Sequence, residues 1–349
     1  MARPKAVPGR PRRKAHVALF EATTLTAKGV KEQLVSRSFP IASVHLYTSS
    51  DDPESNLTEF GGEAMLVTAP DIDLLGSLDI AFLCGSRQDG ARYLDWAGRK
   101  GFVAIDLSRA AEGATNIPLV NAAVNPEAIP DPARVIATPH PIAQFLSSLL
   151  APIRRRCDLV SASAVVFQPA SACGDPGIEE LYRQTTGLLN FQDIPREVFG
   201  RQLAFNLIPA ASYGSAQAPG GADLESLRHE TLRVTGGSYA LALEVVLAPV
   251  FHCHAAAVHV TLPDGAGLES LRAAFDPGEE VRVAGPEDAV SPAESAGKAG
   301  VLVAGLRQAG DRSGFWLWAL TDDLKSGAAR NAVRIAETIL ERGMPRSAA

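Results

Sequence analysis

Val135-Ile-Ala-Thr-Pro-His-Pro-Ile-Ala-Gln-Phe-Leu-Ser-Ser-Leu-Leu150 is the stretch that decides the fold. Residues 134–137 predict a short buried strand, because they are largely β-branched and apolar and are stopped by Thr138-Pro139. Apolar side chains at 142, 145, 146, 149, 150 and 153 have helical spacing and predict a helix over 142–153. Pro141 suits the first position of that helix, since its missing N–H would be unpaired there. A strand therefore leads through a tight turn into a helix N-terminus.

The N-terminus of this predicted helix is a place where an enzyme could hold a thiolate or an oxyanion. Its unpaired N–H groups and roughly half a positive charge favour a negatively charged group there. The tip of the turn carries His140 and Pro141, followed by Ile142. Neither Pro141 nor Ile142 can act as a nucleophile. The position is therefore suited to catalysis but lacks the side chain that would perform it.

Upstream of this stretch, apolar runs alternate with helical segments. We expect strands at 16–21, 44–47, 79–84 and 102–106, and helices at 25–37 and 90–100. Near-continuous apolar runs are typical of strands buried on both faces of a parallel sheet, and their alternation with helices gives βαβ units. The sequence therefore predicts an α/β domain with a Rossmann-type, doubly wound parallel sheet. Such sheets bind ligands beyond the carboxyl ends of their strands.

Downstream, longer β-rich runs are grouped around a few helices, at 159–167, 241–262, 301–306 and 315–320. Helices are expected at 177–190 and 222–234, the first with Glu179, Glu180 and Arg183 on a solvated face. This grouping predicts an α+β domain with a mixed sheet. A terminal helix expected at 325–341 returns to the first domain.

A chain of 349 residues, 46% of them hydrophobic, is long enough for two domains. We expect a disordered basic arm at 1–14, a Rossmann-type domain from 15–140 and 325–349, and a second, catalytic-like domain from 141–324. The net charge of −6 disfavours nucleic acid as a partner, and no apolar run reaches the roughly 18 residues of a membrane span. The four cysteines are scattered without a CxxC pair, which predicts reduced thiols in a cytoplasmic protein.

Four segments carry a family resemblance: VNAAVNPE at 120–127, FGRQLAFNLIP at 199–209, PVFHCH at 249–254 and GAARNA at 327–332. In their order and spacing the chain resembles the aspartate-semialdehyde dehydrogenases, most closely the Usg-like branch, over nearly its whole length from His16 onward. The resemblance implies an NAD(P)-binding domain, a catalytic and dimerisation domain, a homodimer, NAD or NADP as cofactor, and no metal. The reaction it implies is the reductive dephosphorylation of an acyl phosphate to an aldehyde through a cysteine thioester.

Matching the family's motifs residue by residue places Pro141 where its nucleophilic cysteine stands, after the turn at 138–140. The phosphate-gripping arginine of the family corresponds to Glu112, although Arg109 could reach the same place. The arginine two residues before the catalytic histidine corresponds to His252. A proline has no lone pair to offer, and a carboxylate would repel an acyl phosphate. The retained positions are His254, the acid–base histidine of the family, Gln168 and Glu230, with Ser171 and Gly174 of its Ser-Gly-Ala-Gly loop.

The cofactor end departs from the family as well. Its Gly-Ala-Thr-Gly-x-x-Gly corresponds to Glu21-Ala22-Thr23-Thr24-Leu-Thr-Ala27, so that side chains replace all three glycines and Glu21 puts a negative charge where a pyrophosphate would lie. Those glycines allow the tight turn and the close approach of the backbone to the pyrophosphate. After the second strand, Ser49 and Asp51 stand where the family grips the 2′-phosphate of NADP. Asp51 would repel that phosphate but could accept from a ribose 2′-OH, so NAD is less disfavoured than NADP.

His252 and His254, with His140 and Cys173, could meet at one place if the family's geometry holds. Histidine and thiolate would suit zinc, and Cys173 could replace the missing nucleophile beside His254. The interpretation we favour is a polar pocket left over from an active site, without a metal. Trp316 and Trp318 share one face of a predicted strand, where they would pack in a core or a dimer interface.

Three functions follow from these residues. A catalytically silent member of the family, keeping the homodimer and binding a small-molecule ligand or a protein, explains the joint loss of nucleophile, substrate cations and glycine loop. An oxidoreductase acting on an aldehyde or acyl substrate by an altered mechanism would still need NAD(P), with His254 assisting a direct hydride transfer. A scaffold that binds a partner protein, including an active paralogue, is the third.

Overall fold

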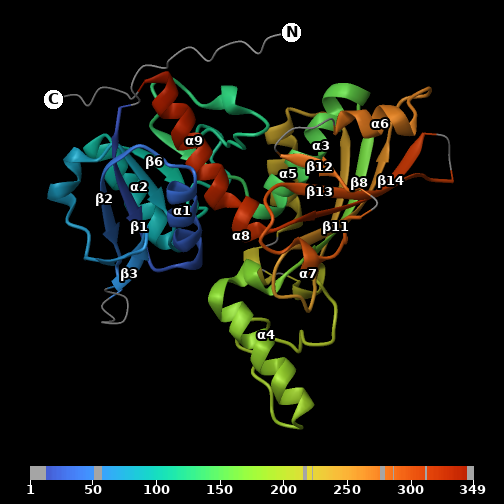
Figure 1. Ribbon diagram of the computed structural model, residues 1–349, viewed down its shortest axis with the longest axis horizontal. Helices are drawn as coiled ribbons and strands as arrows, with labels where there is room; N and C mark the ends of the chain where they lie inside the picture. The colour runs from blue at the N-terminus through green and yellow to red at the C-terminus, as the bar shows by residue number, and fades with distance from the viewer. Residues whose placement is uncertain are drawn as a thin grey trace.

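The computed structural model describes residues 13–50, 57–214, 218–221, 223–275, 280–285, 287–310 and 313–343. Most of the predicted basic arm at 1–14 and Asp51 lie outside these residues. The described chain forms two sheets, each with its own hydrophobic core, and the terminal helix runs beside the first of them (Figure 1). None of the helices in these ranges is both long enough and apolar enough to cross a membrane.

The first sheet has five parallel strands in the order β2-β1-β5-β6-β7. Its strands are β1 (Ala15–Phe20), β2 (Ile41–Tyr47), β5 (Ile80–Leu83), β6 (Val103–Asp106) and β7 (Val135–Ala137). Helices α1 (Leu25–Ser36) and α9 (Ala328–Arg342) cover one face, and α2 (Arg87–Lys100) covers the other. This is the doubly wound parallel sheet that the sequence predicts, and α9 is the terminal helix that returns to it.

A two-stranded hairpin at the edge of this domain was not predicted. It consists of β3 (Leu57–Phe60) and β4 (Glu63–Leu66), joined by Gly61 and Gly62 in left-handed conformations with φ of 64° and 87°. Each strand has only four residues and is largely exposed, so neither leaves a strong apolar pattern in the sequence.

The second sheet is mixed and has the order β12-β13-β14-β11-β8-β10-β9. Pairs β10·β8 and β12·β13 are parallel, and the other pairs are antiparallel. The β-rich segment predicted at 241–262 forms two strands, which the non-strand segment 248–253 separates. The strands are β8 (Ser161–Gln168), β9 (Ile208–Pro209), β10 (Ala240–Leu247), β11 (His254–Thr261), β12 (Val281–Val283), β13 (Val301–Gln308) and β14 (Gly314–Thr321).

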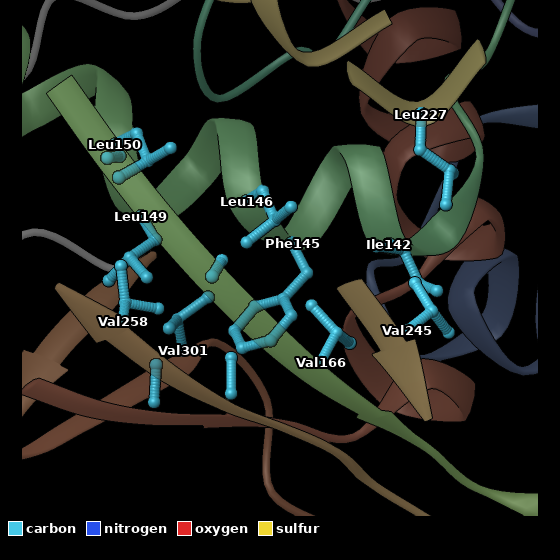
Figure 2. Packing of buried hydrophobic residues seen from close by; sticks show 14 of the residues in the cluster. Ile142, Phe145, Leu146, Leu149, Leu150, Val166, Leu227, Val245, Val258 and Val301 are labelled. Atoms are coloured by element: carbon cyan, nitrogen blue, oxygen red, sulfur yellow. The ribbon is translucent and has the colours of Figure 1, made fainter. Parts of the chain in front are cut away.

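The stretch quoted first forms β7, the turn 138–140 and α3 (Pro141–Cys157), which joins the two domains. Figure 2 shows the apolar side of α3 lying against the second sheet, with Phe145 close to Val166 and Leu149 close to Val258. Twelve side chains of α3 are buried, and even its Gln144, Ser147 and Ser148 are covered. The turn before α3 is therefore fixed from both domains.

The remaining helices surround the second sheet, except that α4 projects away from the body (Figure 1). On α4, Glu179 and Arg183 are exposed as predicted, but the prediction is wrong for Glu180, which is buried. Its carboxylate accepts hydrogen bonds from the backbone N–H of Val198 (2.6 Å) and of Phe199 (3.1 Å). These helices are α4 (Gly174–Leu189), α5 (Leu224–Thr235), α6 (Leu268–Ala274), α7 (Pro292–Ser295) and α8 (Asp323–Ser326), with 3-10 turns at Ile72–Ser77, Pro126–Ala128, Ala170–Cys173, Ala210–Tyr213 and Pro219–Gly221.

Candidate active site

The turn before α3 is held by His140, which caps the helix. Its Nδ1 accepts a hydrogen bond from Ile142 N (3.1 Å), and its Nε2 donates to the carbonyl of Gly220 (2.9 Å). Its backbone N–H donates to the carboxylate of Glu230 (2.7 Å). Burial, with a smaller effect of Arg109, lowers the pKa of His140 to about 3. The imidazole is therefore neutral at pH 7 and acts as an N-cap in place of the usual Ser, Thr, Asp or Asn.

Pro141 and His254 both line a cavity of about 140 Å³ between the two domains. His254 begins β11 and is 1% exposed. Neither of its ring nitrogens has a hydrogen-bond partner among the described residues. Burial lowers the pKa of His254, although Asp323 and Asp322 oppose this effect, so the ring is neutral at pH 7. A neutral imidazole in this position can donate one hydrogen bond and accept another from a molecule in the cavity.

Asp323 is the neighbour of His254 that sequence reasoning missed. Its Oδ1 lies 3.8 Å from Nδ1 of His254, and its Oδ2 accepts a hydrogen bond from the Ser171 hydroxyl (2.9 Å). The backbone N–H of Cys253 also points to Oδ1 (3.3 Å). The acidic pair at 322–323 follows β14, whose Thr321 is paired with His254, and this pairing of distant strands leaves no signal in the sequence. The same cavity is lined by Leu25, Thr26, Gly29, Ala172, Gly174, Leu324, Ala328 and Ala329.

A second cluster combines two arginines with two carboxylates. Arg109, which has a φ of 65° and begins a turn after β6, forms ion pairs with Glu112 and, at 3.3 Å, with Glu230. Arg87 forms an ion pair with Glu112 as well. Burial lowers the pKa of Arg109, and Glu230 opposes that shift. The structure thus brings Arg109, Glu112 and Glu230 together, and their charges are compensated within the chain.

Gln168 and His252 occupy different places around this centre. Gln168 ends β8 beside the start of β11, and its Nε2 donates to the carbonyl of Pro219 (2.8 Å). A Cβ on Gly220 would come within 2.5 Å of that Nε2, which shows how closely the 219–221 turn covers Gln168. His252 is half-buried and is not among the residues that line the His254 cavity.

The two chemical alternatives at this centre gain no support from the geometry. Burial raises the pKa of Cys173 to about 12, with Glu180 adding to the effect, so the thiol stays protonated and is a poor nucleophile. Within the described ranges, no three His, Cys, Asp or Glu side chains are grouped in a way that could hold a metal ion.

The loop from 21 to 24 links β1 to α1. Thr24 caps α1, since its hydroxyl accepts from Ala27 N (3.2 Å) and lies 3.1 Å from the carbonyl of Cys84. Ala22 is fully buried, and its N–H donates to the carbonyl of Tyr47 (2.9 Å), while Thr23 is partly exposed. Glu21 is 8% exposed and accepts from Ser49 N (3.0 Å).

Comparison with known proteins identifies the family. The protein-family model described as "Semialdehyde dehydrogenase, NAD binding domain" matches residues 16–131 of the sequence. A second family model, "Semialdehyde dehydrogenase, dimerisation domain", matches residues 150–325. The chain belongs to the semialdehyde dehydrogenase family. Pro141 lies between the two matched segments, whereas His254, Gln168 and Glu230 lie within the second.

The relatives of this semialdehyde dehydrogenase family member are mainly aspartate-semialdehyde dehydrogenases. That of Synechocystis is 27% identical over 333 residues, covering 94% of this chain and 98% of the relative. The "USG-1 protein homolog" of Azotobacter vinelandii is also 27% identical, with the same coverage. The crystal structure of aspartate semialdehyde dehydrogenase II from Vibrio cholerae, complexed with ASA, is 28% identical and superposes with a TM-score of 0.86 over 95% of this chain and 100% of that chain. The resemblance stated from the sequence is confirmed at the level of family and fold.

Proposed function

We propose that this member of the semialdehyde dehydrogenase family does not catalyse reductive dephosphorylation and serves instead as a binding or regulatory protein. The observation that carries the proposal is Pro141 in the wall of the His254 cavity, at the first position of α3. A helix N-terminus next to a histidine suits an activated thiol, but a pyrrolidine ring has no electron pair with which to attack a carbonyl. Removing a nucleophile typically lowers turnover by about 10⁶ in well-studied hydrolases.

The charge cluster beside this position supports the same conclusion. An acyl phosphate substrate needs uncompensated cations, since charge-assisted contacts to arginine are what bind phosphate strongly. Arg109 and Arg87 instead contact Glu112, and Arg109 also contacts Glu230. Both carboxylates lie at Nη2 of Arg109 and would oppose the negative charge of an entering phosphate, although Nε and Nη1 of Arg109 have no hydrogen-bond partner among the described residues.

The proposal includes a homodimer and membership of the Usg-like branch. The family model that matches 150–325 is named for dimerisation. In that domain, Leu189 and Phe191 at the end of α4 are 67% and 99% exposed, and Trp316 on the second sheet is 36% exposed. Large apolar side chains exposed in this way favour a protein–protein contact. The similarity to the USG-1 homolog supports the branch assignment.

A direct assay tests the proposal. The purified protein is incubated with aspartate semialdehyde, phosphate and NADP or NAD, and reduced cofactor is followed by its absorbance, with the Vibrio cholerae enzyme as positive control. We expect a rate no higher than about 10⁻⁶ of the control. Turnover of about 1 s⁻¹ or more that disappears in a His254→Ala variant would overturn the proposal, because it would show a working active site without the cysteine.

A further inference from the structure

The place where a doubly wound sheet binds its ligand can be located from the strand order. From β1, the chain builds β2 on one side, whereas β5 lies on the other side, so the order reverses between the carboxyl ends of β1 and β5. Dinucleotides bind in the crevice at such a switch point. Glu21 directly follows β1, and Gly85 lies two residues after β5. The side chain that decides what fits in this switch-point crevice is therefore Glu21.

Glu21 turns its side chain into the crevice rather than toward solvent. Its backbone is left-handed, with φ of 57°, and only 8% of the residue is exposed. The carboxylate accepts hydrogen bonds from the Tyr93 hydroxyl of α2, from the Thr48 hydroxyl (3.1 Å) and from Ser49 N (3.0 Å) after β2. A Cβ on Gly85 would overlap Cγ of Glu21. The side chain thus fills the space between the ends of β1, β2 and β5.

Two of the backbone donors near the place of a pyrophosphate, the N–H groups of Ala27 and Ser49, are used within the chain. Helix α1 would normally present its first N–H groups to a phosphate. Here the Thr24 hydroxyl accepts from the N–H of Ala27 and lies within hydrogen-bond distance of the carbonyl of Cys84. The N–H of Ser49, at the end of β2, is taken by Glu21. The residues of this crevice therefore do not fit the NAD or NADP that the family implies.

We infer that the Glu21 side chain excludes NAD and NADP from the wild-type protein. It fills the switch-point crevice and accepts a hydrogen bond from the N–H of Ser49, which a dinucleotide would need there. This inference does not depend on the proposed function, because it rests on residues of the first domain and not on Pro141 or the arginine cluster. It goes further than a missing glycine motif, since it assigns the exclusion to one side chain held by Tyr93 and Thr48.

Titration of the full-length protein with NADH and NADPH, followed by nucleotide fluorescence and by calorimetry, tests the inference. The wild-type protein is expected to show no saturable binding up to about 1 mM nucleotide. Glu21→Gly suits the left-handed backbone, empties the crevice and removes the charge, and it should bind at least about 100-fold more tightly than that limit. Glu21→Gly/Thr24→Gly also frees the N-terminus of α1 and should bind more tightly still.

The matched control is Glu63→Ala, which removes an exposed carboxylate from β4 of the same domain and should leave the protein unable to bind. Folding of each variant is checked by circular dichroism and by its thermal transition. Saturable binding of either nucleotide by the wild-type protein below about 1 mM would overturn the inference. It would also be overturned if Glu21→Gly and the double variant both fold and neither binds. The turnover assay is a separate measurement, so the two conclusions can fail independently.

Discussion

The burial of His140 leads us to expect that the folded protein loses stability as the pH falls below about 6.5. The neutral ring is buried, caps α3 and has its pKa lowered from 6.5 to about 3. In the unfolded chain the same histidine takes up a proton near pH 6.5, so below that pH the unfolded state binds more protons than the folded state. Stability contributed by His140 is therefore complete above pH 6.5 and is lost as the pH falls toward 3. One pKa unit corresponds to about 1.36 kcal/mol.

At pH 5 the solution is roughly 1.5 pH units below the pKa of this histidine in the unfolded chain. Lowering the pH from 7 to 5 should therefore reduce the unfolding free energy by about 2 kcal/mol through His140. Asn caps helices well and does not titrate here, so His140→Asn should keep the cap and remove this loss. Urea unfolding at fixed protein concentration, at pH 7 and pH 5, measures the difference. His229→Asn, at an exposed position on α5, is the control that should retain the wild-type dependence. Equal pH dependence in His140→Asn and the wild-type protein would refute the reasoning.

Three further predictions concern other parts of the chain. Glu180→Gln should lower the unfolding free energy by about 1.5–3 kcal/mol, because it weakens the charge-assisted hydrogen bonds from Val198 N and Phe199 N. The control Glu179→Gln, at an exposed neighbouring position, should change it by less than about 0.5 kcal/mol. Equal effects of the two variants in urea unfolding would contradict the assignment. Asn331→Ala should cost about 2–4 kcal/mol, since the buried amide accepts from Ala122 N (2.7 Å) and donates to Val120 O (2.7 Å), and an unchanged melt would exclude this role. Pro141→Cys should introduce a thiol at a helix N-terminus, and this thiol should react with iodoacetamide at least about tenfold faster than Cys173. We still expect no NADPH formation by this variant, because Glu112 and Glu21 remain in place. Turnover would show that only the cysteine was missing.

Much of the fold was predictable because the relevant patterns are local. The β-branched run before Pro139 and the helical spacing from Ile142 define β7 and α3, and both lie within a residue or a few residues of the predicted bounds. The hairpin of β3 and β4 was missed because strands of four largely exposed residues have no periodic signal. The division of 241–262 into β10 and β11 was missed because the connecting segment is itself apolar.

The candidate site was less accessible to sequence reasoning. The resemblance to the aspartate-semialdehyde dehydrogenases implied that His254 and Pro141 belong to one site, but nothing local indicated that Asp323 lies beside His254. Glu180 follows the spacing of an exposed helix position, yet the chain returns at Val198 and Phe199 to cover it. Such contacts depend on where distant segments pass, which a single periodic pattern does not record.

By itself, the sequence determined most of the longer strands and helices, the main apolar faces of these elements, and that a side chain without an electron pair begins α3. Periodicity and steric preference act over a few residues, so a linear pattern is enough for these features. Only the tertiary structure decided which polar groups meet: Glu21 with Tyr93, 72 positions further along the chain, and Arg109 with Glu230 across the two domains. The physical reason is that a buried charged group needs partners close in space, and these partners come from segments that are distant in the sequence. Which segments lie side by side is set by the packing of both hydrophobic cores.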